Sequence, residues 1–251
     1  MVKPLNEYSV LTFDCYGTLI DWESGIWDAL QPLLMDIHQI DSANLTRNLV
    51  LGSFARHEST HQNNHPKMLY PELLANVHQL LADEFRIKTT DDMNQAFGHS
   101  VPHWPAFPDT ADALRELAKH YKLVILSNID NQGFAASNRK LGVTFDAVYT
   151  AEMIGSYKPA DRNFKFMLKR LREDFGFERE DILHTAQSLH HDHVPARTHN
   201  LANAWIDRQN LAKKSSWGAT AVVEERPRYD YLFPSLQAMA NALEAELGRK
   251  G

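Results

Sequence analysis

Short runs of apolar residues, each followed by an amphipathic stretch, recur along the chain outside residues 21–99. The runs predicted as strands are residues 8–13, 122–126, 145–150, 182–186 and 204–206. Apolar positions three and four apart predict helices over residues 132–141 and 163–175, between these runs. Continuous apolar strands that alternate with helices are typical of a parallel sheet covered by helices on both faces. The pattern therefore predicts the α/β fold class.

Residues 21–99 show a different pattern, in which apolar positions keep helical spacing and no run predicts a strand. Helices are expected after Leu19, over residues 45–60 and over residues 71–85. A helical block between the first strand and the next strand–helix unit is typical of an inserted cap. We therefore expect a core made of residues 1–20 and 100–251, and a helical cap domain over residues 21–99.

The pattern weakens towards the end of the chain. Residues 217–223 are expected to form an edge strand, and residues 224–231 a charged loop. Residues 235–247 carry apolar side chains on one helical face and predict a final helix.

Composition and charge narrow the classes of function. The chain has 251 residues, 43% of them hydrophobic, with 32 acidic residues against 26 Lys plus Arg and a formal net charge of −6. Such a balance does not predict nucleic acid or an anionic membrane surface as a partner. The single cysteine, Cys15, rules out an internal disulfide and favours a reducing compartment. Since no apolar run approaches about 18 residues and no signal peptide is recognised, a cytoplasmic protein is expected.

A carboxylate, Asp14, stands where the first apolar run stops. Gly17 then allows a sharp turn, and Thr18 offers a hydroxyl and a backbone N–H near the same point. Open α/β sheets bind their ligands at the carboxyl ends of the strands, so Asp14 is a candidate nucleophile by its position. The alternative is an Asp that only begins a turn, which is common.

Residues 14–19, with the sequence Asp-Cys-Tyr-Gly-Thr-Leu, resemble the first motif of the haloacid dehalogenase (HAD) superfamily in its type II dehalogenase form. Ser127 with Asn128, then Lys158, then Asp192 match the other three motifs in order. Singly, these residues are also typical of a turn, a solvated charge and a helix cap. The resemblance covers core segments across nearly the whole chain. It implies a HAD-like Rossmannoid core with a parallel sheet and an inserted helical cap.

Tyr16 bears on the choice between two reactions of the superfamily. In the phosphatases, an Asp two residues after the nucleophile protonates the leaving alkoxide, and this chain has Tyr16 at that position. A phenol with a pKa of about 10 is a poor proton donor at neutral pH. A halide leaving from carbon needs no proton, with fluoride as the exception to consider. The residue pattern therefore favours displacement of a halide over hydrolysis of a phosphate ester.

The resemblance implies a hydrolase that acts on carbon–halide bonds, of the (S)-2-haloacid dehalogenase type. Its substrates would be short 2-haloalkanoic acids, which could include fluoroacetate. Asp14 would attack C2 opposite the halide and form an ester, which water hydrolyses to release a 2-hydroxy acid. Asp192 would activate that water, and Lys158 would orient the Asp14 carboxylate. The family reaction needs no metal and no cofactor, and substrate-binding roles are expected for Thr18, Tyr16, Ser127 and Asn128.

The chain departs from the type II pattern at several positions. The fourth motif has Leu189 where the family has Asn, and Phe164 stands where the family has Tyr. The arginine of the family's cap, which binds halide or carboxylate, has two candidates here, Arg47 and Arg56. These departures suggest a divergent subgroup, so the sequence leaves the true substrate, its stereochemistry and the halide range open.

Histidines are concentrated around the predicted site. His190, His191 and His193 flank Asp192, where an imidazole could assist water activation, hydrogen-bond the leaving halide or simply be packed. His57 could face the cleft between cap and core. The further substrate-binding candidates are Arg56 from the predicted cap, Ser188 from the fourth motif, and the histidines His57 and His191.

Three histidines, His57, His61 and His65, lie four residues apart, which is the spacing of metal ligands on a helix. A zinc site would need a further ligand, and Pro66 suggests that the helix ends there. No metal site is therefore predicted.

Two alternatives to dehalogenation stay open at this point. A magnesium-dependent phosphatase would hold its ion with Asp14, the backbone carbonyl of Tyr16 and Asp192. A non-catalytic protein that binds small acids could keep the same fold. The expected partner is a small 2-haloacid, and the frequent dimers of the family imply a homodimer, which no residue pattern tests.

Overall fold

The structure is a computed structural model that describes residues 3–35, 45–213, 223 and 225–249. Six parallel strands form one sheet in the order β3-β2-β1-β4-β5-β6. The central strand β1 (Val10–Phe13) pairs with β2 (Lys122–Ser127) and β4 (Ile182–Ala186). The other strands are β3 (Ala147–Thr150), β5 (Ala202–Ile206) and β6 (Tyr231–Phe233). The prediction of an α/β fold with a parallel sheet is therefore confirmed.

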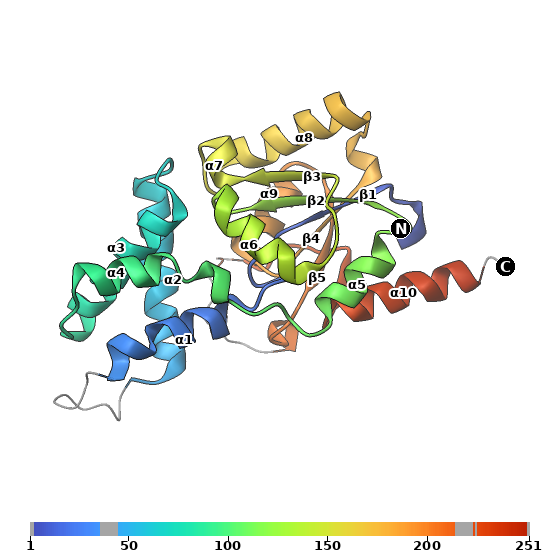
Figure 1. Cartoon of the computed structure of the whole chain (residues 1–251). Coiled ribbons are helices and arrows are strands. Elements are labelled where there is room, and N and C mark those ends of the chain that lie inside the picture. The colour runs from blue at the N-terminus through green and yellow to red at the C-terminus, as the bar shows by residue number, and fades with distance from the viewer. Residues whose placement is uncertain (1–2, 36–44, 214–222, 224, 250–251) are drawn as a thin grey trace.

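Side chains of the central strands alternate between two apolar layers. Leu11 and Phe13 belong to a cluster that includes buried side chains of α5 (Thr110–Leu117) and α10 (Leu236–Gly248). Val10 belongs to a second cluster with side chains of α8 (Asp161–Phe175). Figure 1 shows α8 on one side of the sheet and α5 and α10 on the other. Because both faces are covered, the strands are apolar throughout, which explains why they appear as continuous runs in the sequence.

Three further helices complete the α/β part of the described chain. They are α6 (Asn131–Leu141), α7 (Ala151–Ile154) and α9 (Val194–Thr198). A one-turn π-helix, η5 (Leu189–His193), precedes α9 and carries Asp192. Such π-turns are rare and occur often at functional sites, so this segment draws attention to Asp192.

The first four helices after β1 are α1 (Trp22–Met35), α2 (Arg47–Asn64), α3 (Tyr70–Phe85) and α4 (Asp91–Gly98). We call them the helical insert. Figure 1 shows the insert beside the end of the sheet at which the strands finish. Its buried side chains, such as Phe54, share one apolar cluster with those of the sheet, and Trp104 in the connection to α5 belongs to the same cluster. The helical insert is therefore confirmed, whereas its division from the core into separate domains stays a prediction.

The C-terminal part differs from the expectation. The strand expected over residues 217–223 lies outside the described residues, apart from Val223. One of the two edge strands of the described sheet is β6, which begins at Tyr231, so the loop expected over residues 224–231 was predicted to end one residue too late. The apolar run of this strand has only three residues and is not fully buried, so it is too short to predict a strand. The final helix α10 matches its expected bounds within one residue.

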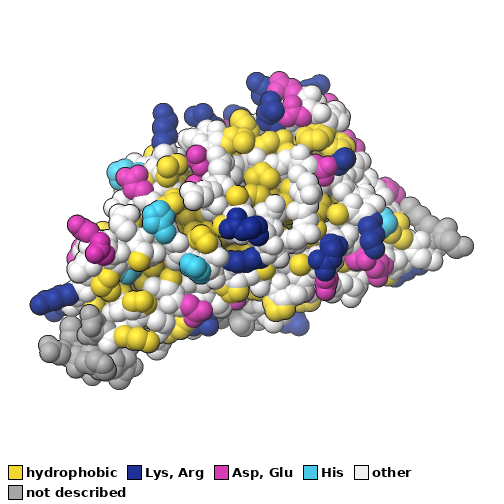
Figure 2. All heavy atoms as spheres, viewed as in Figure 1, with side chains coloured by type: hydrophobic (Ala, Val, Ile, Leu, Met, Phe, Trp, Pro, Cys, Tyr) yellow, Lys and Arg dark blue, Asp and Glu magenta, His cyan; other side chains and the backbone are white. Residues whose placement is uncertain are grey.

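Acidic and basic side chains intermingle on the face of the molecule drawn in Figure 2. The small acidic excess of the sequence therefore does not produce a surface of a single sign on that face. Among the described residues, none of the helices has both the length and the apolar character needed to cross a membrane.

Candidate active site

Asp14 directly follows β1, and its carboxylate is held on both oxygens. Thr18 Oγ1 donates a hydrogen bond of 2.7 Å to Asp14 Oδ2, while Lys158 Nζ donates one of 2.9 Å to Asp14 Oδ1. The backbone N–H of Gln187 in turn donates to Thr18 Oγ1, which fixes the direction of the hydroxyl proton towards Asp14. Gly17 makes the turn possible, because its φ of +97° favours glycine.

Lys158 bridges the two carboxylates of the site. Its Nζ donates to Asp14 Oδ1 at 2.9 Å, to Asp192 Oδ1 at 2.7 Å and to the carbonyl oxygen of Leu126 at 2.9 Å. These contacts satisfy all three protons of the ammonium group. The backbone of Lys158 is held by Asn128, whose side-chain oxygen accepts from Lys158 N and whose amide group donates to Lys158 O. Asn128 therefore positions the lysine.

Asp192 is fixed through one oxygen and leaves the other without a partner. His184 Nε2 lies 3.0 Å from Asp192 Oδ1, and Thr12 Oγ1 lies 2.9 Å from His184 Nδ1. Asp192 accepts, so Nε2 carries the proton and Nδ1 accepts from the Thr12 hydroxyl. Asp192 Oδ2 is buried and has no hydrogen-bond partner among the described residues. This oxygen is therefore available to accept a proton from a water molecule.

The electrostatics keep the lysine charged and Asp192 ionised. Burial raises the pKa of Asp14, and attraction to Lys158 opposes that shift. Although burial alone would raise the pKa of Asp192, Lys158 and the hydrogen bond from His184 hold it well below its usual range. Although burial alone would lower the pKa of Lys158, the carboxylates of Asp14 and Asp192 raise it. Burial lowers the pKa of His184, which keeps that imidazole neutral.

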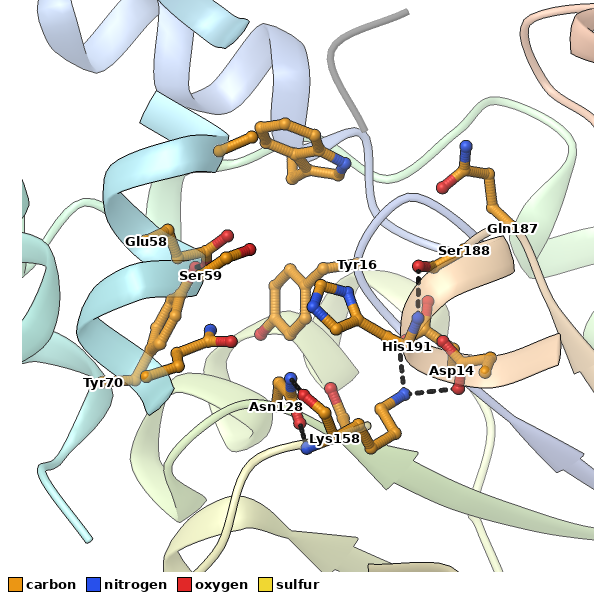
Figure 3. Close-up of a pocket in the computed structure, with 15 residues that line it drawn as sticks. Asp14, Tyr16, Glu58, Ser59, Tyr70, Asn128, Lys158, Gln187, Ser188 and His191 are labelled. Carbon is orange, nitrogen blue, oxygen red and sulfur yellow. Dashed lines mark hydrogen bonds and ion pairs between the residues drawn. The ribbon is translucent and has the colours of Figure 1, made fainter. Parts of the chain in front are cut away.

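A small pocket lies between these groups and the helical insert. Its volume is about 70 Å³, well below the roughly 150 Å³ of a cavity that holds benzene, so it suits a molecule of few heavy atoms. Figure 3 shows Asp14 and Lys158 on one side of the pocket and Glu58, Ser59 and Tyr70 on the opposite side. Glu58 and Ser59 come from α2, and Tyr70 begins α3.

Most of the predicted site residues come together in this pocket. Thr18 reaches it through its hydrogen bond to Asp14. Ser127 Oγ is buried and, among the described residues, has no hydrogen-bond partner. The predicted residues that line the pocket directly are Asp14, Tyr16, Ser127, Asn128, Lys158, Ser188, His191 and Asp192.

Two predicted residues, Arg56 and His57, lie elsewhere, and their assignment to substrate binding is corrected here. Arg56 Nη2 and His57 Nε2 lie 2.7 Å and 2.6 Å from the carboxylate of Glu84 on α3. The Arg56 side chain is 57% exposed and turns away from the pocket. The other arginine candidate, Arg47, donates to Ser24 Oγ and lines a separate cavity. Lys158 is thus the one Lys or Arg among the described residues that line the pocket.

Several pocket residues were missed by the sequence reasoning. Trp22, Glu58, Ser59, Gln62, Tyr70 and Gln187 also line the pocket. The spacing of Glu58 and Gln62, four residues apart, was a signal, because on a helix it places both polar side chains on one face. His184 gave another signal, since a polar residue inside a buried apolar strand needs a partner.

The histidines around Asp192 have different surroundings. His191 lines the pocket, and burial lowers its pKa to about 3, so the imidazole there is neutral. His193 is fully buried and contacts the Asn203 side chain and the carbonyl oxygen of Ala186. Among the described residues, no group of three His, Cys, Asp or Glu side chains has the geometry of a metal site.

A comparison with family models gives the family of the chain. The family model of haloacid dehalogenase-like hydrolases matches residues 8–185. The chain belongs to this family.

Relatives of this HAD family member with a known activity match only part of it. The (S)-2-haloacid dehalogenases of Pseudomonas putida and Pseudomonas fluorescens are each 30% identical over 125 residues, 49% of this chain and 53% of theirs. The chain thus spans about half the length of these curated relatives.

Solved structures resemble the HAD chain over nearly its full length. An L-2-haloacid dehalogenase from Xanthobacter autotrophicus has a TM-score of 0.73 and 16% identity, and the match covers 94% of this chain and 98% of that one. A defluorinating L-2-haloacid dehalogenase has a TM-score of 0.74 and 16% identity, covering 96% and 98%. A magnesium-bound HAD hydrolase from Bacillus subtilis has a TM-score of 0.72 and 18% identity, covering 95% and 99%. At these identities the likeness shows the fold alone.

Proposed function

We propose that this HAD hydrolase removes halide from short 2-haloalkanoic acids, with fluoroacetate among the substrates to test, and releases 2-hydroxy acids. The observation that carries the proposal is the buried arrangement of Asp14, Lys158 and Asp192 beside a pocket of about 70 Å³. The partial match to (S)-2-haloacid dehalogenases supports the same reaction. A homodimer, which the family resemblance implies, stays a prediction.

In the first step, one carboxylate oxygen of Asp14 attacks C2 of the substrate. The carbon–halogen bond breaks, the halide leaves with the bonding electron pair, and an ester forms on Asp14. Lys158 and Thr18 hold the carboxylate in one orientation, which reduces the entropy lost on reaching the reactive geometry. The substrate carbon is inverted, because the attack comes from the side opposite the halide.

In the second step, water attacks the carbonyl carbon of the Asp14 ester. Asp192 Oδ2 takes the proton of that water, and the Lys158 ammonium stabilises negative charge on the ester oxygen that it contacts. When the intermediate collapses, the leaving alkoxide takes the proton that Asp192 holds and is released as the 2-hydroxy acid, and the remaining proton on the Asp14 carboxyl group passes to solvent, which restores the carboxylate. The water oxygen enters the carboxylate of Asp14, whereas the product receives the oxygen that Asp14 supplied in the first step.

The environment of Tyr16 supports dehalogenation over phosphatase activity. Tyr16 Oη lies 2.8 Å from Ser137 Oγ, and burial raises the pKa of Tyr16 well above its usual value. A phenol held in this way is a poor acid for a leaving alkoxide at neutral pH. A halide that is a weak base, such as chloride or bromide, leaves without such a proton.

Halide release by the wild type and Asp14→Asn tests the proposal. Chloroacetate, both enantiomers of 2-chloropropionate and fluoroacetate are supplied in the presence of a chelator, and a phosphate ester with magnesium is assayed in parallel. We expect release from at least one haloacid, and a fall of at least about 10³-fold in Asp14→Asn because the nucleophile is lost.

The matched control is Asp112→Asn, which changes an exposed carboxylate of α5 outside the pocket and should leave halide release unchanged. Turnover of the phosphate ester without any halide release would overturn the proposal in favour of a magnesium-dependent phosphatase. Small-acid binding without turnover in either assay would point to a binding protein instead.

A further inference from the structure

If Asp14 attacks the substrate as proposed, the leaving halide faces the wall of the pocket opposite Asp14. In a displacement at carbon, the nucleophile, the carbon and the leaving group lie in line, so the halide points away from Asp14. Figure 3 shows Glu58, Ser59 and Tyr70 of the helical insert on that opposite side. An inference about this wall rests on the proposed function, because it assumes attack by Asp14.

Glu58 has the surroundings of a neutral carboxyl group. Tyr70 Oη donates a hydrogen bond of 2.6 Å to Glu58 Oε1, and burial of Glu58 outweighs this hydrogen bond, which by itself lowers the pKa of Glu58. No cationic side chain pairs with Glu58 in the described parts of the chain, in contrast to Glu84, which pairs with Arg56. Burial raises the pKa of Glu58 to about 7. Because Oε1 already accepts from Tyr70, the proton of the neutral form sits on Oε2.

The groups near Glu58 do not compete for its proton. Tyr157, which precedes α8, donates its own hydroxyl to the carbonyl oxygen of Met68. The ammonium group across the pocket is already shared between two carboxylates. The titratable groups that line the pocket with Glu58 are Asp14, Tyr16, Tyr70, Lys158, His191 and Asp192.

We propose that the neutral carboxyl group of Glu58 donates a hydrogen bond to the halide as it leaves C2. The carbon–halogen bond breaks towards Glu58, the halide takes the electron pair, and Oε2–H stabilises the negative charge. The proton stays on Glu58 when the halide departs, and the proton released overall comes from the attacking water. Ionised Glu58 would repel the halide instead, so the reaction needs the protonated form.

Fluoride should depend on this donor most strongly, because it is the halide with the most basic anion and the strongest carbon–halogen bond. The test compares wild type and Glu58→Gln on fluoroacetate, chloroacetate and bromoacetate between pH 5.5 and 8.5. The amide of Gln keeps an N–H donor but has no acidic proton to share. Glu72→Gln, which neutralises an exposed Glu on α3, is the matched control.

Because the amide N–H of Gln is a weaker donor than the O–H of a carboxylic acid, we expect Glu58→Gln to lower kcat with fluoroacetate about tenfold, less than the roughly 10²- to 10³-fold cost of losing a preorganised donor altogether. The loss with bromoacetate should stay within about threefold, because bromide is a weak base. In the wild type, kcat/KM for fluoroacetate should fall about tenfold per pH unit above pH 7, and this fall should disappear in Glu58→Gln. Equal losses for all three halides, or an unchanged pH profile, would overturn the assignment.

A binding measurement separates this inference from the proposed function. Free fluoride is titrated into the wild type and Glu58→Gln at pH 6 and pH 8, and its ¹⁹F signal is followed. We expect the wild type to bind fluoride at pH 6. This binding should be at least tenfold weaker at pH 8, and at least tenfold weaker in the variant. Such a result would support the role of Glu58 even if no haloacid is turned over. Absence of such binding in the wild type would contradict it.

Discussion

At the scale of single residues, the site depends on groups that hold other groups in place. His184 is the clearest example, because its Nε2–H contacts Asp192 Oδ1 and its Nδ1 accepts from Thr12. The sequence placed Asp14, Lys158 and Asp192 in the site because each matches a motif after a strand. It did not assign His184 a role. A polar residue inside an apolar strand indicates that a partner exists, but the partner Thr12 follows only from the pairing of β4 with β1.

Replacement of His184 should therefore slow the hydrolysis of the ester more than its formation. We expect His184→Ala to lower kcat about 10- to 100-fold, because Asp192 loses the donor that orients it. His184→Gln, whose amide can still donate, should retain more activity. Mass spectrometry of the quenched enzyme should show the Asp14 ester accumulating in His184→Ala.

His120→Gln, a change at an exposed position, is the control for the His184 variants. If both His184 variants lose activity equally and neither accumulates the Asp14 ester, His184 only supports the fold.

At the scale of elements, the rotation of α2 decides which of its residues meet the substrate. Residues Ala55, Glu58, Ser59 and Gln62 line the pocket and follow the spacing of one helix face. Arg56 and His57 lie between these residues in the sequence. Because an α-helix rotates by about 100° per residue, their side chains point towards Glu84 on α3 instead. The apolar pattern of α2 is too irregular to fix this rotation from the sequence alone. The strands β1, β2, β4 and β5 were predicted well because burial on both faces leaves an unbroken apolar run, whereas the short edge strand β6 was missed.

Loss of Arg56 should have little effect on the reaction. We expect Arg56→Ala to change KM for a 2-haloacid less than about threefold, since Arg56 contacts Glu84 outside the pocket. Its exposed ion pair should contribute at most about 1 kcal/mol to the free energy of unfolding. Steady-state kinetics and urea denaturation of the variant check both values. A rise in KM of about 100-fold would instead place Arg56 at the substrate carboxylate.

At the scale of the whole molecule, the order of the sheet brings the motifs together. The central strand β1 lies between β2 and β4, so the residues that follow these strands meet at one edge beside the helical insert. Three histidines are buried in or near this site, and burial keeps them neutral by lowering their pKa values. Burial lowers the pKa of His184, of His193 and of His191, the last to about 3.

These histidines should make the protein sensitive to mild acid. The unfolded chain binds protons on its histidines below a pH of about 6.5, whereas the folded chain does not, so the free energy of unfolding falls as the pH falls. Each histidine that stays neutral contributes about 1.4 kcal/mol per pH unit in this range. Glu58 acts in the opposite direction, because its raised pKa makes the folded state hold a proton up to a pH of about 7.

Urea denaturation at pH 7.5, 6.5 and 5.5 checks the balance of these effects. The three histidines outnumber Glu58, so we expect a lower midpoint at pH 5.5 than at pH 7.5. The decrease should be smaller in His191→Gln. A midpoint that is equal or higher at pH 5.5 would contradict the neutral state of the buried histidines.

The covalent role of Asp14 is the central claim, and a single turnover in ¹⁸O-labelled water tests it most directly. Enzyme in excess over 2-chloropropionate should give lactate whose new hydroxyl oxygen is ¹⁶O, because that atom comes from Asp14, while the Asp14 carboxylate gains ¹⁸O. Later turnovers should then release ¹⁸O-labelled lactate. Lactate that carries ¹⁸O in the first turnover, with Asp14 unlabelled, would show that water attacks the substrate carbon and would contradict the ester mechanism.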